Sequence, residues 1–244
     1  MDFLTKIRKR LLTFGYTCDN CGRELFDYPD HRFCASCEEK MLRVKRTCPK
    51  CGRETVAEGV CLTCKGDMPK FTQGVAAFSY KGEAAGVVNR MKNGKHRLAA
   101  YLGERMADAV LPIVKQEEAE ILLIPVPLTE SRQKERGYNQ SERLAEAVET
   151  RLKEEGIAVR LDTSILEKHR ETELQKQKTR RERAENVHGA YHVKKRKACR
   201  DKTIVLVDDI LTTGATGSEC ARLLLSAGAS KVIFLVAAAL PEQK

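Results

Sequence analysis

Two adjacent carboxylates, Asp208 and Asp209, stand between a short apolar run and a turn of hydroxyl and small side chains. The run, residues 203–207, is aliphatic and β-branched, which predicts a strand buried on both faces of a parallel sheet and ending at the carboxylates. The turn, residues 212–216, reads Thr-Thr-Gly-Ala-Thr and precedes a helical pattern over 218–226. Backbone N–H groups at a helix start attract anions. The stretch therefore predicts a phosphate cradle beside a pair of carboxylates.

Eight of the ten cysteines form four Cys-x-x-Cys pairs, separated by twelve, ten and nine residues. Thiolates at this spacing are typical of tetrahedral zinc sites, and an ion with four sulfur ligands would be structural because no position is left for water. A cross-braced pairing of first with third and second with fourth pairs stays open, and an iron–sulfur cluster is the alternative metal group. We favour successive pairs, with one zinc held by Cys18, Cys21, Cys34 and Cys37 and the other by Cys48, Cys51, Cys61 and Cys64.

The composition excludes several classes of protein. No run of the 244 residues approaches the length that spans a bilayer, and the start lacks the apolar core of a signal peptide, so we expect a cytoplasmic protein. In a reducing compartment, cysteines favour metal over disulfides. Lys and Arg outnumber Asp and Glu by 44 to 34, a formal charge of +10. Two zinc ions with four thiolates each would lower it to about +6. The chain stays basic, which suits a polyanionic partner.

The excess positive charge is concentrated in residues 168–202, where thirteen Lys and Arg face five Asp and Glu. A stretch within it, at about 168–187, has no apolar pattern, and a loop of this length is typical of a flexible lid. The alternative interpretation of each basic stretch is that its side chains only face water and bind no ligand. The candidate contacts to DNA or pyrophosphate are Arg132, Lys134, Arg183, Lys194, Lys195, Arg196 and Lys197.

Alternating strands and helices must hold these residues in place. We predict strands over 75–80, 121–126, 161–166, 187–193 and 232–239, and helices over 2–14, 83–92, 98–115 and 141–154. The first strand has the pattern of an edge strand, and a basic turn over 92–96 joins two of the helices. Ligands of open α/β sheets bind beyond the carboxyl ends of strands. Arg136 and Asn139, which follow the second strand, are therefore placed to contact a phosphate group.

The acid pair and the turn after it resemble the phosphoribosyl pyrophosphate (PRPP) binding motif of the type I phosphoribosyltransferases. The resemblance implies that Asp208 and Asp209 orient the ribose hydroxyls of Mg-bound PRPP and act in catalysis with Arg136, which faces the pyrophosphate. It also implies that Asn139 and the turn bind the ligand, the turn residues being Thr212, Thr213, Gly214, Ala215 and Thr216.

The four cysteine pairs, the stretch Arg-Gly-Tyr-Asn-Gln over 136–140 and the acid-pair motif together are similar to the ComF/ComFC family of competence proteins. The resemblance implies an α/β fold, with a type I phosphoribosyltransferase-like parallel sheet flanked by helices over 71–244. An N-terminal helix and a small double zinc-ribbon module would precede it over 1–70. The implied cofactors are two structural zinc ions and Mg with PRPP. The implied partners are single-stranded DNA, PRPP and proteins of the DNA-uptake machinery, in the cytoplasm at the inner face of the cell membrane, with peripheral membrane association.

One departure from the transferase pattern leaves two functions open. Purine salvage enzymes place a proton-abstracting Asp where this chain has Thr212, and no base-binding hood is expected after the last strand. The first hypothesis is a competence protein that assists the uptake and handling of single-stranded DNA in natural transformation and binds PRPP. The second is an active Mg-dependent phosphoribosyltransferase with an unidentified amine or base as acceptor.

Overall fold

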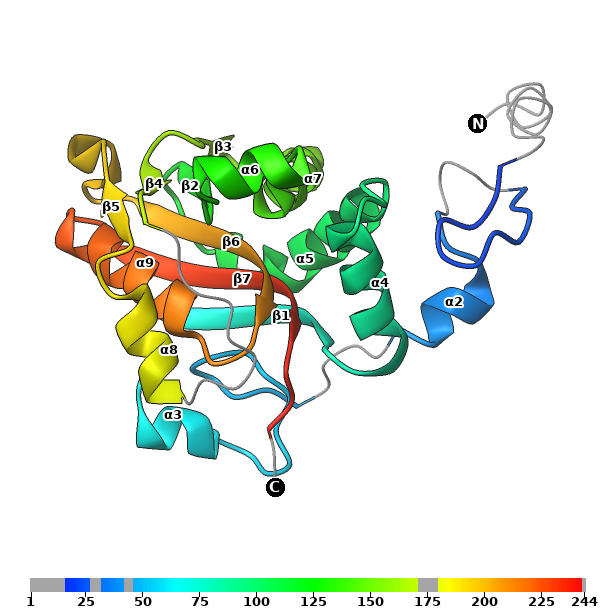
Figure 1. Ribbon diagram of the computed structural model, residues 1–244, viewed down its shortest axis with the longest axis horizontal. Helices are drawn as coiled ribbons and strands as arrows, with labels where there is room; N and C mark the ends of the chain where they lie inside the picture. Colours follow the sequence, from blue (N-terminus) through cyan, green and yellow to red (C-terminus); the bar gives the residue numbers. More distant parts are fainter. Residues whose placement is uncertain (1–15, 27–31, 42–45, 171–179, 243–244) are drawn as a thin grey trace.

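A parallel five-stranded sheet forms the centre of the protein (Figure 1). The computed structural model describes residues 16–26, 32–41, 46–170 and 180–242, so the helix predicted over 2–14 lies outside the described residues. The strands follow the order β1-β7-β6-β2-β3, and β1 is an edge strand as predicted. Their bounds are β1 Gln73–Ser79, β2 Ile121–Pro125, β3 Val159–Leu161, β6 Thr203–Leu211 and β7 Lys231–Ala239. A separate antiparallel pair joins β4 (Leu166–Lys168) to β5 (Tyr191–Val193).

Helices cover both faces of the sheet (Figure 1). The helices predicted over 83–92, 98–115 and 141–154 are confirmed to within one residue at each end. No helix of the described residues combines the length and the apolar character that crossing a membrane requires. The bounds are α2 Ala35–Glu39, α3 Leu62–Gly66, α4 Gly82–Lys92, α5 Leu98–Val114, α6 Glu130–Arg136, α7 Gln140–Glu154, α8 Arg180–Val187 and α9 Ala215–Ser226, with a 3-10 turn at Arg196–Cys199.

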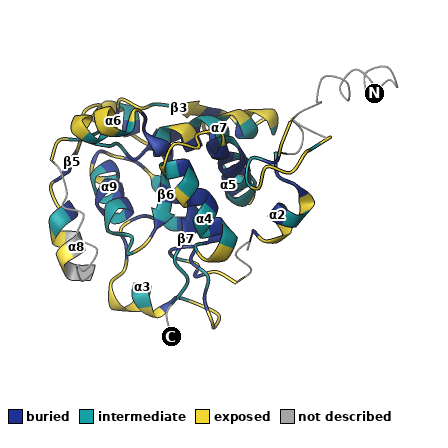
Figure 2. Cartoon of the chain, turned by 45° about the vertical axis from the view of Figure 1, so that its right-hand side comes forward, coloured by how far each residue is buried: buried dark blue, intermediate teal, exposed yellow. Residues whose placement is uncertain are grey.

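Successive residues along each strand point to opposite faces of the sheet, and they contribute side chains to two hydrophobic cores, one on each face. On β6, Val205 and Val207 join the core formed with α4, α5 and α7, whereas Ile204 and Leu206 join the core formed with α9. Figure 2 shows the inner faces of these helices as buried. The first three buried cysteines, Cys18, Cys34 and Cys37, belong to the first core, and Cys48, Cys51, Cys61 and Cys64 belong to the second. The two cysteine groups therefore pack into different hydrophobic cores.

The segment that carries Cys48 and Cys51 lies directly against β1. A Cβ added to Gly52 would lie 2.5 Å from the carbonyl oxygen of Gly74, so the two backbones are too close for a side chain. The end of the described chain reaches the same segment, because the Glu242 carboxylate accepts a hydrogen bond of 2.7 Å from the backbone N–H of Leu62. These contacts build the second cysteine group into the α/β body.

Two predicted strands differ in the structure. The strand predicted over 161–166 is divided between β3 and β4, because the Asp162 carboxylate accepts a hydrogen bond of 2.9 Å from the Ser164 N–H and turns the chain between them. The strand predicted over 187–193 begins only at Tyr191, since the preceding residues form α8 and a turn at Gly189, whose φ is 67°. The predicted lid thus contains a helix at its end, and its residues 171–179 lie outside the described residues.

Two elements extend beyond their prediction. β6 does not end at the acid pair but continues to Leu211, because its pairing with β7 continues to Ala239. The basic stretch after β2 forms the short helix α6, which the apolar pattern does not signal because its residues are all outside the core. Its ends are set by local chemistry: the Thr129 hydroxyl accepts a hydrogen bond from the Arg132 N–H, and Gly137 ends the helix with a φ of 80°.

Candidate functional site

The connections that leave β2 and β6 run in opposite directions across the sheet. β2 continues through α6 and α7 to β3, whereas β6 continues through α9 to β7 on the other side. The carboxyl ends of these two neighbouring strands therefore flank a crevice, which is where open α/β sheets bind ligands. A cleft of about 330 Å³ occupies this place. Its polar lining comprises Lys92, Thr129, Arg132, Arg136, Gln140, Ser141, Lys168, Tyr191, Asp208, Asp209, Thr212 and Thr216.

The acid pair lies at the centre of the cleft. The Asp208 carboxylate accepts hydrogen bonds from the Ser141 hydroxyl at 3.0 Å and from the Asp209 N–H at 2.9 Å. The Asp209 carboxylate lies 3.0 Å from the ammonium group of Lys92. Burial, and then the neighbouring Asp209 carboxylate, raise the pKa of Asp208 to about 7. The Asp208 carboxyl therefore holds a proton up to a higher pH than an isolated carboxyl would.

The turn after the acid pair has the geometry of an anion cradle. Gly214 stands at the N-cap of α9 with a φ of 83°, a conformation that favours glycine. Gly217 lies against the Phe234 ring, and a Cβ there would come within 2.5 Å of it, so the helix start is held close to β7. The first turn of α9 has no acidic side chain that would compete for its N–H groups. The start of α9 is therefore suited to bind a phosphate group.

Four cations surround the two carboxylates, and they come from three separate parts of the chain. Arg132 and Arg136 lie on α6, Lys92 ends α4, and Lys168 ends β4. The Arg136 guanidinium donates a hydrogen bond of 2.7 Å to the Gln140 side chain, and the Lys168 ammonium lies 5.4 Å from the centre of the Tyr191 ring. With four positive groups around two carboxylates, the cleft is suited to a ligand that carries several negative charges.

Some of these residues were not singled out from the sequence as contacts. Lys92 belongs to the basic turn over 92–96, whose charge was the only signal of its place over the cleft. Ser141, Lys168 and Tyr191 gave no local signal, because they reach the cleft only through the packing of α7 and of the β4–β5 pair. Tyr191 is buried, and burial raises its pKa far above the ordinary range for a phenol. It therefore stays a neutral hydroxyl.

The structure places other candidate residues outside this cleft. Asn139 is buried, and its amide group donates to the Val126 carbonyl at 3.1 Å and accepts from the Ser141 N–H at 3.0 Å, so it fixes the start of α7. Thr213, Gly214 and Ala215 line a neighbouring cavity of about 180 Å³. Lys134 is exposed on α6 beside Glu130, and nothing is described of the Arg183 side chain.

The basic cluster over 194–197 lies between β5, whose Tyr191 lines the cleft, and the amino end of β6. Lys194 is 3.5 Å from the Glu167 carboxylate, Lys195 donates to the Ser164 hydroxyl at 2.6 Å, and Arg196 donates to the Ser226 carbonyl. The side chain of Lys197 is exposed. Three residues of extended chain span about 10 Å, so the backbone of Lys194 lies no farther than that from the backbone of Tyr191, which lines the cleft.

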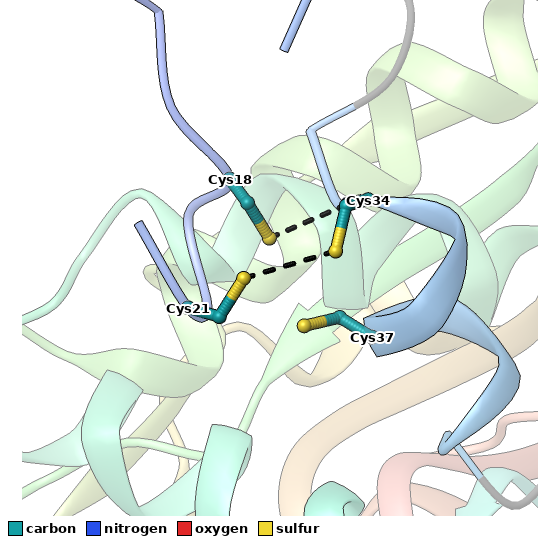
Figure 3. A group of neighbouring side chains, drawn as sticks. All are labelled: Cys18, Cys21, Cys34 and Cys37. Atoms are coloured by element: carbon teal, nitrogen blue, oxygen red, sulfur yellow. Dashed lines mark hydrogen bonds between the residues drawn. The ribbon is translucent and has the colours of Figure 1, made fainter. Parts of the chain in front are cut away.

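The eight paired cysteines form two tetrads from successive pairs, so the favoured grouping is confirmed. The sulfur atoms of each tetrad lie within 4.8 Å of one another. Figure 3 shows the four sulfur atoms of the first tetrad pointing toward one another. The sulfur atoms of Cys21 and Cys34, and those of Cys51 and Cys61, are 3.7 Å apart. A tetrahedral zinc ion with Zn–S bonds of about 2.3 Å requires about 3.8 Å between its sulfur ligands. Each tetrad could therefore hold one structural zinc ion.

Arg53 connects the second tetrad to the turn after the acid pair. Its side chain is only 5% exposed. The guanidinium donates one hydrogen bond to the Cys51 sulfur at 3.3 Å and another to the Thr212 carbonyl at 2.9 Å. Contacts of this kind, between a metal-binding sulfur and a ligand loop, hold both ends in a fixed orientation. Arg53 was not recognised from the sequence, because its partner lies 159 residues away.

The raised pKa of Asp208 predicts a measurable dependence of stability on pH. The unfolded carboxyl has a pKa of 3.8 and the folded one of about 7, so the folded state binds more protons between these values. The free energy of unfolding contributed by this group therefore falls as the pH rises toward 7 and stays low above it. Asp208→Asn removes the effect. At pH 8 we expect the variant to melt about 2–4 °C higher than the unmodified protein. A gain of about 1 kcal/mol in the free energy of unfolding shifts the melting temperature of a protein of this size by that amount.

Differential scanning fluorimetry of both proteins at pH 6 and pH 8 measures this difference. The gap in melting temperature between variant and unmodified protein should widen from pH 6 to pH 8. An equal gap at both values would contradict a raised pKa at Asp208.

Comparison with known proteins agrees with the fold. The phosphoribosyl transferase domain model matches residues 108–244, more than half of the chain. Competence protein ComFC of Bacillus subtilis strain 168 is 27% identical over 88% of this chain and 73% of its own length. Competence protein F of Haemophilus influenzae strain Rd is 24% identical over 92% of this chain and 85% of its own length. DNA utilization protein YhgH of Escherichia coli O6:H1 strain CFT073 is 27% identical over 70% of this chain and 74% of its own length. The chain therefore belongs to the phosphoribosyl transferase domain family and, within it, to the ComF/ComFC competence proteins.

Proposed function

We propose that this protein assists the handling of single-stranded DNA during DNA uptake and that its cleft binds Mg-bound PRPP. Relatives named competence proteins and DNA utilization proteins support the first part. One observation carries the second part: two adjacent carboxylates, a helix N-terminus with threonines and four cations meet at one edge of the sheet. PRPP has the complementary groups, which are two ribose hydroxyls, a 5′-phosphate and a pyrophosphate.

Each part of PRPP has a partner among the described residues. Asp208 and Asp209 would accept hydrogen bonds from the ribose hydroxyls, and the turn with Thr212 and Thr216 would hold the 5′-phosphate at the start of α9. Arginine suits the pyrophosphate because its guanidinium bonds two phosphate oxygens at once, and α6 supplies two arginines. Mg²⁺ bound with the pyrophosphate would neutralise part of its charge. A ligand of this charge also explains why Lys92 stands so near the acid pair.

An active transferase is the second candidate, and the cations favour it. Departure of pyrophosphate develops negative charge, which the arginines and lysines of the cleft would stabilise without rearrangement. The only carboxylates that line the described cleft are Asp208 and Asp209, and Thr212 is exposed where a base would stand. The acceptor would therefore have to be a nucleophile that needs no protein base. Release of pyrophosphate from PRPP with a panel of amines and nucleobases tests this candidate, and no release above hydrolysis counts against it.

Two zinc ions complete the proposal as structural cofactors. Every ligand position of each tetrad is a cysteine sulfur, which leaves none for water or substrate. The backbone N–H groups of Cys34 and Cys61 donate hydrogen bonds to the Cys18 and Cys48 sulfur atoms at 3.3 and 3.4 Å, as thiolates require. The protein would work in the cytoplasm, next to the membrane machinery that imports the DNA strand.

Arg53 gives the proposal a specific prediction. Arg53→Met keeps the length of the side chain but leaves the Thr212 carbonyl without its donor, so the turn loses its anchor to the second tetrad. We expect the affinity for Mg-bound PRPP, measured by calorimetry, to fall about tenfold, as loss of about 1.4 kcal/mol would give. Arg46→Met is the matched control, because Arg46 donates to the Val56 carbonyl in an exposed part of the same segment. Equal affinities of the two variants would show that Arg53 does not position the turn.

The proposed function is tested by measuring the two ligands together. Fluorescence anisotropy of a labelled single-stranded oligonucleotide should show binding that weakens steeply with salt, as expected when basic side chains displace counterions from phosphates. Addition of Mg-bound PRPP should change that affinity if the cleft and the DNA surface are coupled. An oligonucleotide that does not bind even at low salt would remove the DNA part of the proposal, and an unchanged affinity would separate the two sites.

A further inference from the structure

We infer that single-stranded nucleic acid binds in a second cavity beside the cleft, and not on the basic cluster over 194–197. The inference rests on the proposed function for its ligand, and the structure supplies the location. The cavity measures about 480 Å³. We call it the arginine groove, and its lining residues are Arg32, His96, Arg97, Ala100, Arg136, Gly137, Tyr138 and Arg143.

The lining of the arginine groove is basic throughout. It contains four arginines and one histidine and no carboxylate. The nearest acids stand behind the arginines: Arg32 lies 4.0 Å from both Asp19 and Glu104, and Arg143 pairs with Glu146 on the exposed side of α7. The Arg143–Glu146 pair is exposed and therefore weak, and the two contacts of Arg32 are at the outer limit of an ion pair, so both arginines can still bind a phosphate. The electrostatic field within the groove is therefore positive.

The start of α5 breaks a local rule in the same place. The N-terminus of a helix carries partial positive charge and is normally capped by an oxygen or an acid. α5 has Arg97 at its N-cap, no side-chain cap and no acid in its first turn. Positions that break a local rule without a structural gain are expected at functional sites. The N–H groups of residues 98–100 are bonded to the carbonyls of residues 95–97, so an anion in the groove would be attracted by the positive end of the α5 dipole and not by free N–H groups.

The groove is continuous with the cleft. Arg136 lines both the groove and the cleft, so a phosphate held there is shared between them. On its far side, His96 and Arg97 also line a cavity of about 510 Å³ against the first tetrad. A linear polyanion could thus extend from the cleft past the α4–α5 turn to the first tetrad. A single small anion would use only one of these three cavities.

The groove also presents a flat ring to a strand with unpaired bases. The exposed His96 ring meets the edge of the buried Tyr138 ring at 4.1 Å between ring centres, with planes 83° apart. Tyr138 is fixed by the hydrogen bond from its hydroxyl to the Met91 carbonyl at 2.5 Å. The imidazole is therefore held by a rigid neighbour, and the His96 residue is exposed to solvent. Proteins that bind single strands combine such ring faces with a positive groove.

Two double variants test whether the strand binds in the arginine groove or on the basic cluster over 194–197. Each variant removes two positive charges. The groove variant is Arg97→Gln with Arg143→Gln, and the control is Lys195→Gln with Lys197→Gln in the cluster over 194–197. None of the four residues lines the cleft. Anisotropy of a labelled single-stranded oligonucleotide is measured against salt, and calorimetry measures Mg-bound PRPP. Thermal unfolding verifies that each variant is folded.

We expect the groove variant to bind the oligonucleotide at least tenfold more weakly and to lower the salt slope by about 1.4, since each lost phosphate contact on a single strand removes about 0.7. The control should keep the slope, and both variants should keep their PRPP affinity. If the salt slope of oligonucleotide binding falls for the control but not for the groove variant, the strand binds on the cluster over 194–197 and the inference is overturned. If neither variant changes the slope of a protein that does bind the strand, the inference fails while the proposed function stands. If the unmodified protein does not bind the strand, both fail.

Discussion

Replacing Asp208 and Asp209 together by asparagine is expected to lower the affinity for Mg-bound PRPP at least a hundredfold. Asparagine keeps the size of both side chains but removes the two negative charges that face the Lys92 ammonium and would face the ribose hydroxyls. Hydrogen bonds to a charged acceptor contribute about 1.5–3 kcal/mol each, so the loss of two is large. Titration calorimetry at pH 8, where the unmodified pair is ionised, measures the effect.

The matched control is Asp201→Asn. Asp201 is exposed at the amino end of β6, seven residues before the pair, and its φ of 56° is a conformation that asparagine also adopts. The control should bind PRPP as the unmodified protein does. The double variant should at the same time be more stable at pH 8, because it no longer holds two adjacent carboxylates in a buried place. A double variant that binds PRPP normally would show that the acid pair does not hold the ribose.

The second large effect is expected at the second tetrad. Cys51→Ser should lower the melting temperature by on the order of 10 °C and release one zinc ion per chain, whereas Cys21→Ser should cost clearly less. The sulfur of Cys51 is buried in the core with Phe71 and Phe234, and Cys21 is exposed. Zinc bound by four thiolates contributes to folding directly, so a defective site in the core removes both metal and packing.

Thermal unfolding and zinc analysis of both variants test this difference. The unmodified protein should contain two zinc ions per chain, and each variant one or slightly more. The ranking follows from where each tetrad packs: the second is fixed to β1 at Gly52 and Gly74, with no room for a side chain between them. Equal losses of stability for the two variants would contradict the view that the second tetrad belongs to the α/β body.

Much of this architecture could be predicted from the sequence because its signals are local. The acid pair, the glycine at the N-cap of α9 and the Cys-x-x-Cys pairs are each contained within a few residues, and the cysteine pairs form the two tetrads that their spacing indicated. The helices with a regular apolar face, α5 and α7, were placed to within one residue. In such elements burial and helix period agree, so sequence alone is sufficient.

The remaining features depend on contacts between distant parts of the chain. Arg53 reaches Thr212 across 159 residues, and Ser141 reaches Asp208 across 67. The stretch over 161–166 was predicted as one strand because both ends are apolar, yet the Asp162 side chain turns the chain between β3 and β4. α6 has no buried residue, so only Thr129 and Gly137 at its ends could have indicated it. Packing, not local propensity, decides these cases.

The packing of the two tetrads also bears on how the protein could combine its two ligands. The first tetrad lies beside the cavity that continues from the arginine groove, and the second is connected through Arg53 to the turn that would hold the 5′-phosphate. Each proposed ligand therefore has one tetrad close to its site. A change in either ligand site could reach the other through Arg136, which lines both the cleft and the groove.

Binding of Mg-bound PRPP in the cleft between β2 and β6 can be measured by titration calorimetry of the unmodified protein, loaded with two zinc ions, against PRPP with and without Mg²⁺. We expect saturable binding at one site per chain with Mg²⁺, and weaker binding without it. If a protein that is folded and contains its zinc gives no binding heat with either form at several temperatures, the cleft does not bind PRPP.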